Sequence, residues 1–359
     1  MDEQTADRLT RLRERLAADG LDQLLVTDLQ NIRYLSGFTG TAATLLIGSE
    51  SAAFLTDFRY VTQAAEQVSA SFDRLDGGDD PRKTLTDLFS GKVGFDDAHT
   101  TVASFRRFDQ AKPAESELVA AGGVVEDLRA VKDQAELKAI SQAAEIADQI
   151  YRRLVEDGFA GKTEQFVARR IEQLAHEFGA EGLSFPPIVA HGGHGALPHA
   201  EPRDVAIGRA QLIVVDLGVK FEGYCSDATR TFAVGNVSDA ARDVYGIVLE
   251  AQLAGLEAVT EGAQASAVDN ATREIITAAG HGERFGHSTG HGVGLEVHER
   301  PTLSHKSSDV LLKGNVVTVE PGIYLDGQFG VRIEDLVVVE PAGSPRILSG
   351  FPKELITTD

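Results

Sequence analysis

The 359-residue chain has a single cysteine, Cys225, so it cannot form an intramolecular disulfide bond. A lone thiol is typical of proteins from a reducing compartment. The first 20 residues are charged and helical in pattern, and they lack the apolar core of a signal peptide. No apolar run reaches the roughly 18 residues that span a bilayer. We therefore expect a cytoplasmic protein without a membrane segment.

Basic residues are also scarce. The chain has 34 Lys and Arg against 55 Asp and Glu, which gives a formal net charge of −21. Nucleic acids and anionic membranes bind surfaces with clustered Lys and Arg, so this balance argues against both as partners. With 42% hydrophobic and 25% charged residues, the composition is that of a globular protein. A length of 359 residues favours two domains over one core.

Two regions differ in how helical and strand patterns are arranged. In residues 1–127, short apolar runs bounded by turn residues alternate with helical segments, which predicts a small α/β domain. Residues 128–359 begin with a long amphipathic helix from Leu137 and a second helix capped by Thr163 and ended by Gly179. The rest holds two helices near 239–259 and 265–279 and the β runs PPIVA, AQLIVVDLG, CSDATRTFAV, NVVTVEPGIYL and GVRIEDLVVVE.

Acidic side chains mark the first pair of these β runs. Asp216 ends AQLIVVDLG, and Asp227 lies 11 residues later in CSDATRTFAV. A single tight turn between the strands would be centred between Phe221 and Glu222, which places the aspartates opposite each other with Cβ atoms about 5 Å apart. Like charges repel at that distance, and apolar neighbours make their burial more costly still.

The same pattern recurs in a second pair of strands. Glu320 ends NVVTVE and Glu334 lies in GVRIEDLVVVE, with Gly327 midway in a credible turn. Taken singly, each acid fits a solvated strand end or a turn cap. Two opposed pairs beside apolar strands require a cation instead. Two divalent ions neutralise four carboxylates, and a water between ions about 3.5–4 Å apart becomes a nucleophile near neutral pH.

The stretch GHSTGHGVGLEVHE, from Gly286 to Glu299, holds three of the ten histidines in the chain and four glycines. Glycine lets the backbone pass close to other groups because it has no Cβ atom. One imidazole added to four carboxylates gives an oxygen-rich site, which suits Mn²⁺, Co²⁺ or Zn²⁺ better than a structural zinc site of Cys and His. Taken singly, each of these histidines could also be a buried core residue whose ring is hydrogen-bonded.

Together these motifs resemble the pita-bread metallopeptidases: methionine aminopeptidase, aminopeptidase P and prolidase. Residues 1–127, with NIRYLSGFTG and TDFRY, are similar to the N-terminal domain of the proline-specific branch. The resemblance implies an α+β chain, with a smaller α/β creatinase-type domain at 1–127 and a pita-bread (creatinase/aminopeptidase-like) catalytic domain at 128–359. The five metal ligands of the family match Asp216 in VVDLG, Asp227 in CSDATRTF, His291 in GHSTGHGVG, Glu320 in TVEPGIY and Glu334 in VRIEDL.

The resemblance also implies roles beside the ligand set. His298 corresponds to the histidine that hydrogen-bonds the substrate carbonyl, and His199 to one that aids proton transfer or substrate binding. His287 matches a histidine that lines the substrate pocket, and Arg332 matches an arginine that supports the site by hydrogen bonding. Glu320 would also act as the proton shuttle.

Three further residues invite a chemical role but have a simpler interpretation. His191 and His194 are interpreted as loop residues, with a place in the substrate pocket as the alternative. Cys225 lies two residues from Asp227 and is interpreted as a packing residue rather than a ligand or nucleophile.

The implied function is hydrolysis of the Xaa-Pro bond at the N-terminus of dipeptides or short peptides by a dinuclear metallopeptidase. Mn²⁺ is the first choice of metal, with Co²⁺ or Zn²⁺ as alternatives, and the family also implies a homodimer. Creatinase, which works without metal, and metal-free pita-bread modules that bind peptides share the fold, but the complete ligand set argues against both. The choice between a prolidase limited to dipeptides and an aminopeptidase P stays open.

Overall fold

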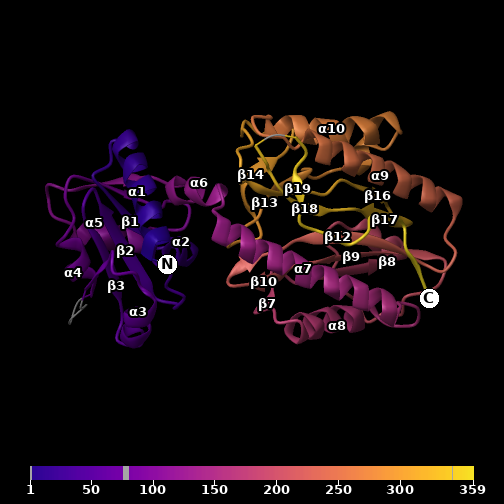
Figure 1. The fold of residues 1–359 in the computed structure, drawn as a ribbon, viewed down its shortest axis with the longest axis horizontal. Helices are drawn as coiled ribbons and strands as arrows, with labels where there is room; N and C mark the ends of the chain where they lie inside the picture. The colour runs from indigo at the N-terminus through magenta and orange to yellow at the C-terminus, as the bar shows by residue number, and fades with distance from the viewer. Residues whose placement is uncertain (1, 76–80, 342) are drawn as a thin grey trace. The chain divides into compact units, whose positions relative to one another are not determined.

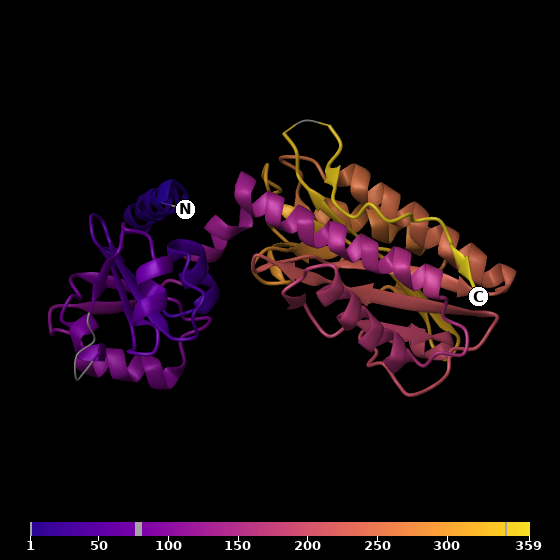
Figure 2. The same cartoon turned by 60° about the horizontal axis from the view of Figure 1, so that its bottom comes forward.

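The computed structural model describes residues 2–75, 81–341 and 343–359. The chain forms two compact units, Met1–Arg129 and Ala130–Asp359 (Figures 1 and 2). Among the described residues, no helix is both long and apolar enough to cross a membrane.

The first unit combines one sheet with helices. Its elements are α1 (Asp2–Asp19), β1 (Gln23–Val26), α2 (Leu29–Ser36), β2 (Ala43–Gly48), β3 (Ala52–Thr56), α3 (Val61–Gln67), β4 (Asp73–Leu75), α4 (Pro81–Thr86), β5 (Lys92–Phe95), α5 (Val102–Ala111), β6 (Glu117–Ala120) and α6 (Val124–Ala130). The strand order is β4-β3-β2-β1-β5-β6. β1 is antiparallel to β2 but parallel to β5, and β5 is parallel to β6.

Burial on this sheet explains which elements the sequence predicts. The leucines that predict the first helix, Leu9, Leu12 and Leu16, are all buried in α1. On the sheet, Val93 of β5 packs with Phe108 of α5 in one apolar cluster. β4 and β6 were not predicted; both are short, and neither contains a fully buried residue. The helix α2 was not predicted either.

The second unit contains four long helices and many short strands. Its first half comprises α7 (Gln134–Asp157), α8 (Glu164–Glu177), β7 (Gly182–Leu183), β8 (Ile188–His191), the 3₁₀ turn η1 (Gly192–Ala196), β9 (Gln211–Leu217), β10 (Val219–Phe221), β11 (Tyr224–Cys225) and β12 (Ala228–Val234). Its second half comprises α9 (Asp239–Ala258), α10 (Ala265–Ala278), the 3₁₀ turn η2 (Gly282–Arg284), β13 (Gly290–Gly292), β14 (Glu299–Leu303), β15 (Val316–Val319), β16 (Gly322–Leu325), β17 (Phe329–Arg332), β18 (Asp335–Val338), β19 (Arg346–Ile347) and β20 (Thr357–Thr358).

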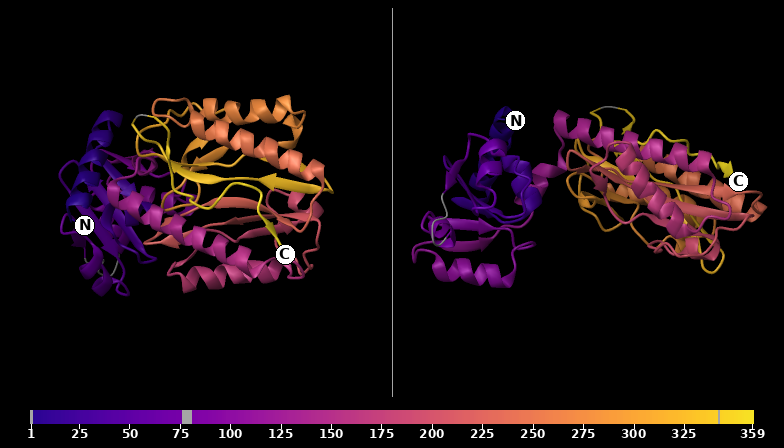
Figure 3. Two further views of the ribbon diagram at one scale, coloured as in Figure 1. Left: turned by 45° about the vertical axis from the view of Figure 1, so that its right-hand side comes forward. Right: turned by 90° about the horizontal axis from the view of Figure 1, so that it is seen from below.

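The strands of this unit lie between two pairs of helices, α7 with α8 and α9 with α10 (Figures 1 and 3). The two largest sheets have the orders β20-β12-β9-β8 and β14-β13-β15-β18-β19. Tyr151 of α7 and Ile171 of α8 pack on Phe232 of β12 in one cluster, and Val248 of α9 packs on Val331 of β17 in another. The predicted combination of helices and sheets in this region is therefore confirmed.

The first predicted hairpin is present, but its register differs from the prediction by two residues. Asp216 pairs with Thr229, not with Asp227. The turn centre lies one residue later than predicted, because Glu222 and Gly223 take the positive φ angles of 48° and 81° that a two-residue hairpin turn requires. A shift of two residues keeps every side chain on its face of the sheet, so Asp216 and Asp227 still point the same way, diagonally rather than directly across.

The second hairpin has the predicted register. Val319 pairs with Asp335 and Gly322 pairs with Arg332, which sets Glu320 opposite Glu334. Each predicted β run is nevertheless divided into two strands, because β15 and β18 belong to the five-stranded sheet while β16 and β17 form a separate pair. At the break, the Glu334 N–H donates to the Thr229 carbonyl at 3.1 Å. The two hairpins meet at this point.

Candidate metal centre

The five predicted ligands lie together in one buried site. Ligand atoms of Asp227, His291 and Glu334 all lie within 4.8 Å of one another. His291 Nε2 is 3.6 Å from Asp227 Oδ2 and 3.3 Å from Glu320 Oε1. The charge of Asp216 acts on Asp227 and on Glu334, so this carboxylate belongs to the same cluster. Two hairpins and β13 thus bring four acids and one imidazole to one place.

Glycine on both sides allows His291 to enter the site. A Cβ atom at Gly290 would lie 2.0 Å from the Thr318 carbonyl oxygen, and one at Gly292 would lie 2.1 Å from the Arg300 carbonyl oxygen. β13 therefore fits between β14 and β15 only without side chains at these positions. His291 Nδ1 lies 3.1 Å from the Gly292 carbonyl, and Nε2 faces the carboxylates. When Nδ1–H of the neutral imidazole donates to that carbonyl, Nε2 can bind a metal.

The electrostatics of the site call for cations. Burial raises the pKa of Asp227 well above its usual range, and neighbouring carboxylates raise it further. Burial and the charge of Glu320 do the same to the pKa of Glu334. Burial also raises the pKa of Asp216, although Arg332 offsets part of the effect. Glu320 differs: burial raises its pKa, but His291, His287 and Arg332 together outweigh burial and lower it.

The donor set fits divalent metal ions. Asp216 Oδ1 is buried and has no hydrogen-bond partner, which is unfavourable unless a cation or water meets it. Four carboxylates carry more negative charge than the adjacent Arg332 can neutralise. Oxygen-rich sites with one imidazole bind Mn²⁺, Co²⁺ or Zn²⁺, so these five residues could hold two such ions.

Arg332 connects the ligands to one another. Its Nη2 donates to Asp216 Oδ2 at 2.6 Å, and its Nε donates to Thr229 Oγ1 at 3.0 Å. The Thr229 hydroxyl in turn donates to Glu334 Oε2 at 2.7 Å. Both acids are therefore oriented by partners beyond the ligand set, as metal ligands commonly are.

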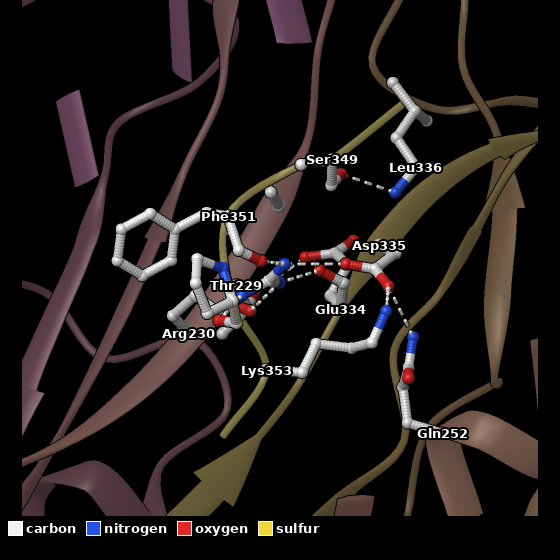
Figure 4. Close-up of polar contacts among 12 residues, drawn as sticks. Thr229, Arg230, Gln252, Glu334, Asp335, Leu336, Ser349, Phe351 and Lys353 are labelled. Carbon is white, nitrogen blue, oxygen red and sulfur yellow. Dashed lines mark hydrogen bonds and ion pairs between the residues drawn. The ribbon is translucent and has the colours of Figure 1, made fainter. Parts of the chain in front are cut away.

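A second polar layer lies on the opposite face of the same strands (Figure 4). Arg230, next to Thr229, forms a buried ion pair with Asp335, next to Glu334, at 2.7 Å. Arg230 also donates to the carbonyl oxygens of Thr229 and Glu334. Lys353 Nζ reaches Asp335 Oδ2 at 2.6 Å. This network holds the two hairpins together directly behind the site.

The remaining predicted residues border the carboxylates. His298 stacks edge-on against His291, with ring centroids 4.3 Å apart. Burial lowers the pKa of His287 and of His298, and the charge of His199 lowers both further. His287 Nε2 lies 2.9 Å from the hydroxyl of Tyr324. His199 is exposed.

The structure corrects the interpretation of His191 and His194. His191 ends β8 and is not a loop residue, and its Nδ1 lies 2.7 Å from Glu164 Oε1. His194, in η1, has its Nδ1 3.0 Å from Glu164 Oε2, and the Arg203 N–H donates to the same oxygen at 2.9 Å. Burial opposes ionisation of Glu164, but these hydrogen bonds outweigh it and hold its pKa well below the usual range. Both histidines therefore anchor η1, the turn that precedes His199.

Thr229 and Tyr324 at the site, and Glu164 at the η1 turn, were not predicted. Tyr324 accepts a hydrogen bond from Arg332 Nη1 at 2.9 Å. Its ring passes over Gly322, where a Cβ atom would lie 2.7 Å from the hydroxyl. Period-two spacing from Glu320 gives a signal for Tyr324, but no comparable signal exists for Glu164. Cys225 is buried in an apolar cluster, as its interpretation as a packing residue requires.

Comparison with known proteins places these observations in a family. Residues 138–341 match metallopeptidase family M24, and residues 8–131 match the creatinase/prolidase N-terminal domain. A Xaa-Pro dipeptidase of Pyrococcus horikoshii is 34% identical over 98% of this chain and 99% of its own. The structure of a Xaa-Pro dipeptidase from Bacillus anthracis is 39% identical with a TM-score of 0.95, covering 98% and 99%. That of an X-Pro aminopeptidase from Thermotoga maritima is 36% identical with a TM-score of 0.87, covering 96% and 100%.

Proposed function

The chain belongs to metallopeptidase family M24, and from this we propose that it hydrolyses the bond between an N-terminal residue and a following proline in dipeptides or short peptides. The observation that carries the proposal is the buried cluster of Asp216, Asp227, His291, Glu320 and Glu334. The chain is similar, over nearly the whole length of both, to relatives named Xaa-Pro dipeptidase, and this similarity supports the choice of substrate.

Each residue has a proposed task. Two divalent ions held by the five ligands would supply a Lewis acid and lower the pKa of a bound water. His298, kept neutral by burial, donates a hydrogen bond to the oxygen of the scissile carbonyl. Glu320 takes up the proton of the attacking water and passes it to the leaving proline nitrogen. His287 lines the space for the proline, and His199 assists proton transfer or substrate binding.

Arg332 orients rather than reacts in this scheme. Its contact with Asp216 Oδ2 fixes one ligand, and its contact with the Tyr324 hydroxyl fixes the partner of His287. The free amino group of the substrate would sit near the acidic cluster, which favours a cationic terminus and explains removal of a single residue.

We further propose Mn²⁺ as the working metal, with Co²⁺ or Zn²⁺ as substitutes, a homodimeric assembly and a cytoplasmic location. The oxygen-rich donor set supports the metal. The single buried cysteine supports a reducing compartment.

Metal removal and restoration test the proposal. Chelator treatment should abolish hydrolysis of Ala-Pro, and Mn²⁺ or Co²⁺ should restore it, whereas Ala-Ala should remain uncut throughout. His291→Ala should be inactive, while His305→Ala, which removes an exposed imidazole, should keep wild-type turnover. Full turnover by the chelated protein would favour a creatinase-like hydrolase, and peptide binding without turnover would favour a binding module. The ratio of Ala-Pro to Ala-Pro-Ala turnover separates a dipeptidase from an aminopeptidase.

A further inference from the structure

A second group of carboxylate and imidazole side chains lies in the first unit, at the carboxyl ends of three neighbouring parallel strands. Asp28 follows β1 by two residues, Asp96 directly follows β5, and Glu126 lies in α6, which follows β6. β1, β5 and β6 are adjacent and parallel. In the sheet, β2, to which the chain continues after β1, lies on one side of β1, whereas β5 lies on the other side. The direction in which strands are added to the sheet therefore reverses at β1. Open α/β sheets bind ligands outside the carboxyl ends of strands at such a reversal.

The side chains of this group converge without bonding one another. One ligand atom each from Asp96, His99 and Glu126 lies within 4.8 Å of the other two. His99 Nδ1 is 3.8 Å from Asp28 Oδ1, and His99 Nε2 is 3.9 Å from Glu126 Oε1. Both distances are too long for hydrogen bonds. Two metal bonds of about 2.0–2.2 Å each span about 4 Å, so an ion fits between such a pair.

Asp96 supplies an independent sign that a ligand is required. The residue is 6% exposed, and its Oδ2 is buried with no hydrogen-bond partner. Its Oδ1 accepts from the Ala98 N–H at 3.1 Å and the His99 N–H at 3.4 Å, so the turn holds the carboxylate in place. Burial and the charge of Glu126 raise the pKa of Asp96. A buried oxygen without a hydrogen-bond partner, on a carboxylate that lies close to a second acid and an imidazole, is stabilised by a cation.

We propose that Asp96, His99 and Glu126 bind one divalent cation of the Zn²⁺ or Mn²⁺ class, while Asp28 lies on the Nδ1 side of the imidazole. Carboxylates with a single imidazole are donors that such ions accept. Asn31 orients two of the acids, since its N–H donates to Asp28 Oδ2 at 2.8 Å and its Nδ2 donates to Glu126 Oε1 at 2.6 Å. The bound ion joins the loop after β5 to α2 and α6. This site shares no residue with the centre built around His291.

Counting Zn²⁺ ions on the full-length chain tests this site. The protein is stripped with chelator, dialysed against Zn²⁺ alone, and its metal content is measured against protein concentration. The count is made for the wild-type chain and for Asp96→Asn, His99→Gln and Asp97→Asn. The asparagine at 96 keeps the oxygen that accepts the turn hydrogen bonds. Asp97→Asn removes an exposed carboxylate one residue away and is the matched control.

The same three substitutions are repeated with Asp227→Asn, which weakens metal binding at the other centre. We expect Asp96→Asn and His99→Gln each to lose one Zn²⁺ per chain in both backgrounds, with unchanged circular dichroism, whereas Asp97→Asn keeps the wild-type count. Equal counts in Asp96→Asn, His99→Gln and the Asp97→Asn control would overturn the proposal. Because the count does not depend on peptidase activity, this result stands apart from the proposed function.

Discussion

Replacing Asp227 by Asn should change the stability of the protein in opposite directions with and without metal. In the metal-free protein, Asp227 lies among other carboxylates and repels them. The nearly isosteric amide removes one negative charge and keeps the shape of the site, so the metal-free variant should be more stable than the metal-free wild type. With Mn²⁺ in excess the order should reverse, because the variant loses a metal ligand.

The expected size follows from the geometry. Ligand atoms of Asp227 and Glu334 lie within 4.8 Å of each other. Two unit charges at that distance repel by about 3.5 kcal/mol at an effective dielectric constant of 20. Partial protonation, favoured by the raised pKa of Asp227, and the nearby Arg332 reduce this repulsion, so we expect a gain of about 1–3 kcal/mol. In the metal-loaded state, a ligand at 100 times its dissociation constant stabilises by about 2.7 kcal/mol, which the variant loses in large part.

Thermal unfolding followed by circular dichroism measures both states, since the chain has no tryptophan to report by fluorescence. Each protein is measured after chelation and again with excess Mn²⁺. Asp326→Asn removes an exposed carboxylate from the β16–β17 turn and should stay within about 0.5 kcal/mol of wild type in both states. A metal-free Asp227→Asn variant that unfolds below the metal-free wild type would refute the argument from charge repulsion.

Three further outcomes follow from the same structure. Arg230→Met leaves Asp335 buried with only part of its partners and should cost about 3 kcal/mol of unfolding free energy. Arg152→Met removes an exposed guanidinium 4.0 Å from Asp148 and should cost less than about 0.5 kcal/mol in the same urea titration. Tyr324→Phe removes the hydroxyl that contacts both His287 and Arg332. It should lower kcat/KM for Ala-Pro roughly 5–100-fold at unchanged metal content, and wild-type kinetics would show that the hydroxyl does not position His287 for catalysis. Burial raises the pKa of Cys225 to about 11, so iodoacetamide should label the native thiol far more slowly than the unfolded one at any pH below that value, and equal rates would contradict the burial.

Much of the candidate centre was predictable because its residues follow local rules. Period-two alternation sets which face of a strand a side chain occupies, so Glu320 and Glu334 could be paired from their distance to Gly327 alone. Amphipathic spacing likewise predicted α1, α7 and α8. These patterns depend on neighbours in the chain, and the printed sequence contains them.

The residue-by-residue pairing of strands was harder to predict from the sequence. The hairpin of Asp216 and Asp227 was placed two residues out, because the positive φ angles at Glu222 and Gly223, not the acids, fix its turn. The predicted face of each side chain was still correct, since a shift of two residues leaves every side chain on the same face of the sheet. The sequence also did not predict that each long β run is divided into two strands, at Glu320 and at Glu334, because this division follows from the contact between the two hairpins.

The sequence by itself determined the chemistry that is available: which acids and histidines exist, on which strand faces they lie, and that the acids call for cations. Only the tertiary structure decided which groups become partners. Glu164 meets His191 and His194, and Asp96 meets Glu126, across long stretches of chain with no common local pattern. Such contacts form because packing of helices on sheets fixes distant segments side by side, and the free energy of that packing is a property of the whole unit rather than of any short segment.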